Sequence, residues 1–166
     1  MVTEPESVEY RFAGAVDAAS VAALLRALDS HYHPDKTHPS KAVYLQMVGR
    51  VFDGREGTRF VLAIRKGKPV GIACIAILRP GNSLKGLIFL KDLFVVETAR
   101  GLGIGRGLMG FLSQLALAKG IGRIDLTTDS DNEGAVRLYE ELGGQRREKV
   151  AFTFDVEAMK KLADPE

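Results

Sequence analysis

The sequence predicts a single α/β (α+β) domain, with a mixed, mostly antiparallel sheet of about six or seven strands flanked by about four helices. The chain has 166 residues without an internal repeat or a Pro/Ser-rich linker, which favours one core. Three β-rich runs within 59–97 indicate an antiparallel meander. A strand, helix, strand order over 86–129 implies a right-handed crossover and a parallel pair. We expect one domain over 8–158, with short tails at 1–7 and 159–166.

The N-terminal part is expected to form one short strand and two helices. A strand candidate covers 8–13. The segment 17–32 repeats apolar residues at the spacing of one helical face, and Asp17 or Ser20 can cap its start. A loop with two prolines and three histidines then precedes a second helix over 41–53.

In the middle of the chain the spacing of the apolar residues changes from one typical of helices to one typical of strands. Two β-rich runs, 59–65 and 69–78, are joined by a turn centred on Gly67, which is typical of a β-hairpin. A third run over 86–97 extends the meander. The single cysteine, Cys74, lies among apolar residues, so we expect a core side chain rather than a catalytic thiol.

The C-terminal part alternates helices and strands. The apolar spacing predicts helices over 106–120 and 132–144, with a strand over 121–129 between them and a last strand over 150–156. A short amphipathic helix at the C-terminus could form a homodimer contact, although nothing in the sequence requires one.

Charge and hydropathy argue against two classes of partner. The net charge is +2 and the acidic and basic residues are mixed along the chain, so nothing points to nucleic-acid binding. The N-terminus is acidic and lacks the pattern of a signal peptide, and the longest apolar runs are far below about 18 residues. We therefore expect a soluble cytoplasmic protein that binds neither nucleic acid nor membrane.

A turn rich in glycine and arginine, 99–109 (ARGLGIGRGLM), lies between a strand and a helix. The backbone N–H groups of such a turn and the positive end of the helix dipole converge on one point, which suits a phosphate. Arg100 and Arg106 can add charge-assisted hydrogen bonds. A purely structural turn is the alternative. A Walker A loop and a dinucleotide fingerprint both fit poorly, because the Gly-Lys-Ser/Thr end is missing and a meander precedes the turn.

Two motifs resemble those of the GNAT superfamily of N-acetyltransferases. The stretch LFVVETARGLGIGRGLM resembles its acyl-CoA-binding motif, with Arg100, Gly103 and Gly105 in the defining places. The stretch NEGAVRLYEELGG is similar to a later family segment, and its matching residues are Asn132, Ala135, Leu138, Tyr139 and Gly143. The resemblance implies the GNAT fold, whose sheet is splayed where the parallel pair opens for acyl-CoA.

Within the superfamily the sequence is similar to diamine (spermidine/spermine-type) and small aminoglycoside acetyltransferases. Diamine-type enzymes often carry Glu-Asp in the strand before the turn, whereas this chain has Lys91-Asp92. The resemblance implies transfer of an acetyl group from acetyl-CoA to a primary amine of a small molecule (polyamine, aminoglycoside or amino-acid-like), by direct attack on the thioester and without a metal. A protein lysine or N-terminal acetyltransferase, or a non-catalytic CoA sensor, is the alternative.

Two residues are candidates for catalysis. Tyr139 matches the family's general acid, and a core tyrosine is the structural alternative. Asp92 interrupts an apolar strand, which makes it a candidate base or ligand of the substrate ammonium, while an ion pair with Lys91 is the alternative. Alternation places Asp92 on the same face as Leu90 and Phe94, unless a bulge resets it.

The resemblance also implies a set of cofactor-binding residues. Backbone groups of Leu93, Phe94 and Val95 would hold the thioester and pantetheine arm, with the Val95 N–H as an oxyanion donor. The pyrophosphate would lie against Arg100, Gly101, Leu102, Gly103, Ile104, Gly105 and Arg106. Asn132, with Ala135, would contact the pantetheine, although an asparagine ahead of a helix is also an ordinary N-cap.

The histidine-containing loop borders the acceptor site in this superfamily. The resemblance therefore suggests that His31, Tyr32 or His33 contacts the substrate. A zinc site is the other reading of the three histidines, but their spacing with His38 matches no standard closed site and no cysteine accompanies them.

Overall fold

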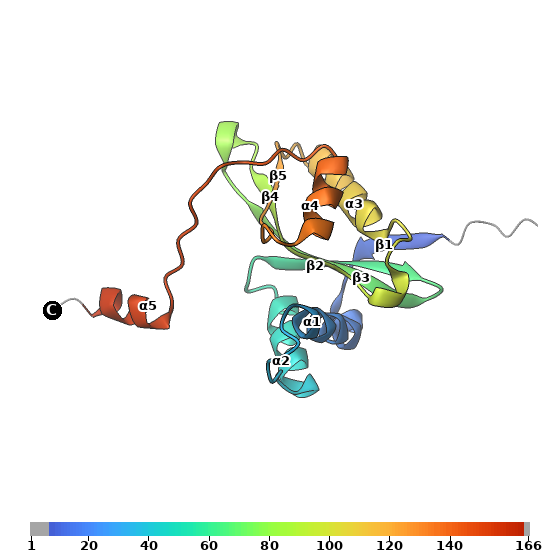
Figure 1. Cartoon of the computed structure of the whole chain (residues 1–166), viewed down its shortest axis with the longest axis horizontal. Coiled ribbons are helices and arrows are strands. Elements are labelled where there is room, and N and C mark those ends of the chain that lie inside the picture. The colour runs from blue at the N-terminus through green and yellow to red at the C-terminus, as the bar shows by residue number, and fades with distance from the viewer. Residues whose placement is uncertain (1–6, 165–166) are drawn as a thin grey trace, which may run out of the picture. The chain divides into compact units, whose positions relative to one another are not determined.

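The structure, a computed structural model, describes residues 7–164 (Figure 1). These residues form five strands and five α-helices. The chain divides into two compact units, Met1–Asp129 and Ser130–Glu166, and each is described by itself. The α/β class expected from the sequence is confirmed.

The first unit is built on one sheet with the strand order β1-β2-β3-β4-β5. The strands are β1 (Val8–Phe12), β2 (Thr58–Arg65), β3 (Lys68–Leu78), β4 (Leu87–Val95) and β5 (Ile124–Leu126). The first three neighbouring pairs are antiparallel, and β4 and β5 are parallel. The mixed sheet predicted from the sequence is therefore confirmed.

A tight turn joins β2 to β3. Lys66 and Gly67 have φ values of 52° and 71°. Two consecutive residues in the left-handed region are typical of a type I′ turn, whose twist matches that of the flanking strands. The hairpin predicted from the glycine between the two β-rich runs is confirmed.

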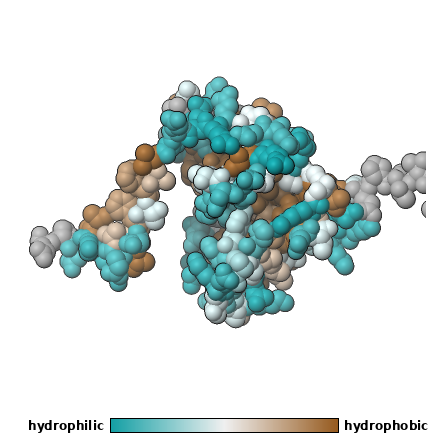
Figure 2. Space-filling model, viewed as in Figure 1, coloured by the Kyte–Doolittle hydropathy of each residue, from teal (hydrophilic) through white to brown (hydrophobic). Residues whose placement is uncertain are grey.

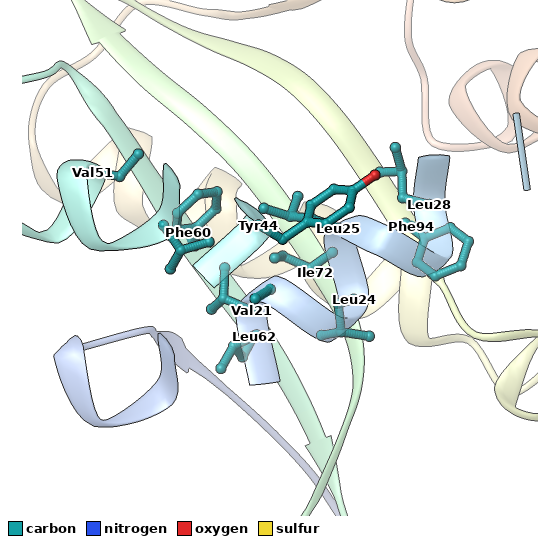
Figure 3. Close-up of a cluster of buried hydrophobic side chains, with 12 residues drawn as sticks. Val21, Leu24, Leu25, Leu28, Tyr44, Val51, Phe60, Leu62, Ile72 and Phe94 are labelled. Carbon is teal, nitrogen blue, oxygen red and sulfur yellow. The ribbon is translucent and has the colours of Figure 1, made fainter. Parts of the chain in front are cut away.

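Helices α1 (Ala18–Tyr32) and α2 (Lys41–Phe52) cover one face of the sheet (Figure 1). Their buried residues recur at three- and four-residue spacing, so each helix presents one apolar stripe to the strands. Figure 3 shows these side chains converging with those of the sheet. The cluster consists of Val21, Ala22, Leu24, Leu25, Leu28, Tyr44, Val48, Val51, Phe60, Leu62, Ile72 and Phe94.

Helix α3 (Ile104–Ala118) covers the opposite face (Figure 1). Its buried residues, Ile104, Leu108, Leu112 and Ala116, follow each other at four-residue spacing. A Cβ added at Gly71 of β3 would lie 3.2 Å from the Ile104 side chain, so strand and helix are in close contact. Gly120, with a φ of 62°, follows the end of the helix, as predicted for its C-terminal cap.

The second unit contains α4 (Glu133–Glu141) and α5 (Val156–Ala163). The Asn132 side chain accepts a hydrogen bond from the Ala135 amide (3.2 Å), and Asp155 accepts one from Ala158 (2.9 Å). Both are N-caps of the helices that they precede. No helix within residues 7–164 is both long and apolar enough to cross a membrane.

The last strand predicted over 150–156 is wrong, and the sheet of the described residues has five strands rather than six or seven. Residues 150–155 belong to no helix or strand, Val156 begins α5, and Phe152 and Phe154 are 83% and 60% exposed. Hydrophobic residues gather along it and on α5 (Figure 2). An alternating apolar pattern indicates which face of a strand would be buried, but a strand also needs a neighbouring strand edge to pair with. The regular elements of this unit are helices, which offer no such edge.

Candidate active site

A bulge in β4 determines which side chains face the two layers of helices. Ile75 of β3 pairs with Leu90, and Cys74 pairs with Asp92, so Lys91 is an extra residue in β4. Cys74 packs against the α1/α2 cluster, and its neighbour in β3, Ile75, points to the opposite face of the sheet. Leu90 therefore faces α3, whereas Asp92 faces α1 and α2. The bulge has reset the alternation that would place both on one face.

Asp92 lies in a partly enclosed, charged position. Its side chain is 26% exposed, and one carboxylate oxygen is 3.3 Å from the Lys91 ammonium. Burial, together with the negative charge of Asp92, raises the pKa of the neighbouring Cys74 thiol to about 11. A thiol with such a pKa stays protonated at neutral pH, which argues against a catalytic role for Cys74. The ion pair weighed as the alternative for Asp92 is present in the structure.

Part of β4 has no strand beside it. Strand β5 pairs with β4 only as far as Leu90, and among residues 7–164 no strand continues along 91–95 on that side. The Ile88 amide donates to Arg123 (3.0 Å), ahead of β5, whereas the Val96 amide donates to Val70 (3.0 Å), next to β3. This unpaired stretch is called the open edge below.

The amides of Leu93 and Val95 point toward the open edge. The peptide groups of a strand point to alternate sides, and the Val96 amide points toward β3. Leu93 and Val95 lie three positions and one position before Val96, so their N–H and C=O groups point away from β3. The Ile88 amide points toward β5, and strict alternation from Ile88 would direct the even-numbered amides to that side. The extra residue Lys91 shifts the alternation by one position, so beyond it the odd-numbered amides point there. Unpaired donors on a strand edge can bind an extended ligand by strand addition.

The glycine-rich turn follows the open edge directly. Gly101 and Gly103 both have a φ of 75°, a conformation that glycine adopts without strain. A Cβ at either position would meet no atom within 4 Å, so the backbone conformation, not lack of space, requires these glycines. Gly103 is the N-cap of α3, whose first-turn N–H groups have no partner within the helix. A helix start of this kind attracts anions.

Arg100 connects the turn to the open edge. Its Nε donates to the Val95 carbonyl oxygen (3.1 Å), and its guanidinium carbon lies 5.8 Å from the centre of the Phe94 ring. Arg106, on the first turn of α3, is exposed. The structure thus brings together most of the residues predicted to bind the cofactor, namely Leu93, Phe94, Val95, Arg100, Gly101, Leu102, Gly103, Ile104, Gly105 and Arg106.

The end of α1 meets the same region. The centre of the His31 ring is 6.0 Å from that of Phe94 and 5.3 Å from that of Tyr32. The side chains of His31 and Tyr32 are exposed. His33 instead ends α1, its carbonyl accepting a hydrogen bond from the His38 ring (3.0 Å). Within residues 7–164 no group of three or more His, Cys, Asp or Glu residues is arranged to hold a metal ion.

The remaining predicted site residues lie in the second unit. Asn132 is the N-cap of α4, the structural alternative considered for it. Ala135, Tyr139 and Leu142 are separated by four and three positions, are each half-buried, and share one face of the helix. Sequence reasoning considered Lys91 only as the alternative ion-pair partner of Asp92 and did not locate the bulge at Lys91. The signal was two consecutive charged residues in an apolar strand, a pattern that a bulge accommodates.

Comparisons with known proteins identify the family of this chain and structures that share its fold. A model of the acetyltransferase (GNAT) family matches residues 21–144. Thialysine N-epsilon-acetyltransferase of Mus musculus is 35% identical over 80 residues, 46% of this chain and 47% of that protein. The chain therefore matches about half the length of this curated relative.

Two solved structures resemble the whole chain. An integron cassette protein from V. cholerae is 30% identical, with a TM-score of 0.86 over 95% of this chain and 98% of the other. An aminoglycoside N-acetyltransferase in complex with CoA is 19% identical, with a TM-score of 0.72 over 94% and 99%. At that identity the second likeness concerns the fold alone.

Proposed function

Because the chain belongs to the acetyltransferase (GNAT) family, we propose that it transfers the acetyl group of acetyl-CoA to a primary amine of a small molecule. The observation that carries the proposal is the open edge of β4, which leads directly into the glycine-rich turn and α3. An extended, amide-containing chain that ends in a pyrophosphate fits this sequence of donors. A relative named for acetylation of thialysine supports a small amine as acceptor.

The residues of the first unit would hold acetyl-CoA in two parts. The Leu93 backbone groups would pair with the pantetheine arm as an added strand would, while the Val95 carbonyl stays bonded to Arg100 and the Val95 N–H would face the thioester. The N–H groups of the turn and of the first turn of α3 would bind the pyrophosphate, and Arg100 would contribute positive charge. By the family resemblance, Asn132 and Ala135 would also contact the pantetheine.

Three groups would carry the chemistry of the transfer. Asp92 or an ordered water accepts the proton of the acceptor ammonium, and the free amine attacks the thioester carbonyl carbon. The Val95 N–H stabilises the negative charge that develops on the carbonyl oxygen. The C–N bond forms and the C–S bond breaks, Tyr139 donates its proton to the departing sulfur, and the second proton lost by the nitrogen restores the Tyr139 hydroxyl through water. Acceptor recognition would involve His31, Tyr32 or His33 at the end of α1.

The proposal is tested by release of free thiol from acetyl-CoA with a panel of polyamines, aminoglycosides, amino acids and lysine peptides. Thiol release with peptides alone would favour a protein acetyltransferase. If no amine releases thiol although CoA raises the melting temperature, the catalytic proposal fails and a CoA sensor remains.

Tyr139→Phe should lower the maximal rate with little change in the KM for acetyl-CoA, because the variant removes only the proton donor. Tyr44→Phe is the matched control. It also removes one hydroxyl, but that hydroxyl donates to Asp29 (2.6 Å) within the α1/α2 layer. Equal rates for the Tyr139→Phe variant and the wild type would remove Tyr139 from the mechanism.

A further inference from the structure

Two carboxylates of the sheet each pair with a neighbouring cation. Asp92 pairs with Lys91 at 3.3 Å, and Asp125 of β5 pairs with Arg123 at 3.0 Å. In each pair the cation comes from the same segment of chain as the carboxylate. The four side chains are between 26% and 67% exposed, so an incoming ligand can reach them.

Both carboxylates lie on the face that α1 and α2 cover. Asp125 is in register with Phe89 of β4, which pairs with Ala76 of β3. Ala76 is two residues from Cys74, the partner of Asp92, and residues two apart in a strand share a face. The two carboxylates therefore lie on the same face of two adjacent strands.

These two carboxylates offer no surplus of negative charge to a polycation. Each carboxylate already faces a cation, and Arg100 adds a further positive charge at the open edge, where it bonds to Val95. An acceptor with several ammonium groups would meet like charges at Lys91 and Arg100, and such juxtapositions disfavour binding. An acceptor that carries a carboxylate in addition to its ammonium groups can replace both members of the Lys91–Asp92 pair.

We propose that the acceptor is an amine of the amino-acid type, and that Lys91 determines this specificity by binding the acceptor carboxylate while Asp92 receives the ammonium. The proposal rests on the acetyl transfer proposed above and uses the same transfer step. Lys91 is suited to the role because it is the extra residue of the bulge, next to Asp92 in sequence and 67% exposed.

Pairs of acceptors that differ only by the carboxylate test the proposal. We would measure kcat/KM for lysine against cadaverine and for ornithine against putrescine, each with acetyl-CoA. The wild type should prefer the amino acid of each pair by about tenfold or more. Lys91→Glu should reverse the preference, and Lys91→Gln should give an intermediate ratio. Lys68→Glu, the same charge reversal at an exposed residue of the β2–β3 hairpin, should leave the ratio as in the wild type.

Binding separates this proposal from the proposed function. Calorimetric titration of the same acceptors into the protein with CoA bound reports the preference whether or not transfer takes place. A wild-type preference for the diamines, or Lys91→Glu ratios equal to those of Lys68→Glu, would overturn the role of Lys91. Absence of turnover with all acceptors, combined with the expected binding preference, would instead overturn catalysis and leave the recognition intact.

Discussion

Replacement of Gly107 by alanine gives a sharp test of how α3 is seated on the sheet. Gly107 lies in the second turn of α3, and the Tyr10 ring of β1 packs directly against it. A Cβ at this position would overlap the Tyr10 hydroxyl and would lie 2.8 Å from Cε1 of the ring. Gly110, on the same helix, is exposed, and a Cβ there would meet no atom within 4 Å. The two glycines thus differ in contacts but not in secondary structure.

The opposing contributions can be estimated from general magnitudes. Glycine to alanine inside a helix stabilises by about 1 kcal/mol, which is the full expectation for Gly110→Ala. At Gly107 the added methyl must displace the tyrosine ring, and overpacking of this kind costs about 1 to 3 kcal/mol. We expect Gly107→Ala to destabilise by about 1 kcal/mol, so the two variants should differ by about 2 kcal/mol.

Urea denaturation followed by circular dichroism measures both free energies of unfolding. In a Tyr10→Ala background the obstacle is gone, and Gly107→Ala should then stabilise as Gly110→Ala does. The reasoning is refuted if Gly107→Ala is as stable as Gly110→Ala in the presence of Tyr10, or if the double-mutant cycle shows no coupling.

Two further predictions concern charged side chains of the first unit. The Arg11 guanidinium and the Gly14 amide hold the pKa of Asp17 at about 2, below its ordinary 3.8, so its ionised form stabilises the fold above pH 4 and this contribution is lost as the pH falls toward 2. Asp17→Asn should therefore lower the free energy of unfolding by about 1 to 2 kcal/mol at pH 6 and by much less at pH 2, and a constant difference across the titration would contradict this assignment. Arg100→Ala removes the hydrogen bond to the Val95 carbonyl and a positive charge at the turn, and should raise the Kd for CoA about tenfold in calorimetry. Arg55→Ala, in the exposed loop after α2, should leave that Kd unchanged, and equal values for the two variants would remove Arg100 from the binding site.

Local patterns predicted those parts of the fold that depend on local chemistry. The apolar spacing of α1 and α3 identified the buried residues Val21, Leu24 and Leu108, because one helical face must pack on the sheet. The turn at Gly67 followed from its permitted left-handed conformation. The strand predicted over 150–156 failed because pairing depends on an edge that the sequence pattern does not contain.

The sequence predicted many residues of the candidate site but not how these residues are arranged in space. Two motifs identified the residues of the turn and of α4. The exposure of Tyr32 and the contact of His31 with Phe94 depend on how the end of α1 meets β4, which involves residues far apart in sequence. The pairing of Asp92 with Lys91 was considered only as an alternative, because adjacent residues of a regular strand point to opposite faces.

The bulge at Lys91 explains why one apolar strand can serve both the core and the site. Continued without it, the register of Ile75 with Leu90 would place Asp92 opposite Ala73, on the fully buried face under α3. An unpaired carboxylate there would cost several kcal/mol. Without the bulge the alternation of peptide groups would also be shifted by one residue, so the Val95 amide would point toward β3 and away from the open edge. A single extra residue therefore brings the carboxylate to the accessible face and frees the backbone donors beside it, so the proposed chemistry and the proposed binding of acetyl-CoA have one structural origin.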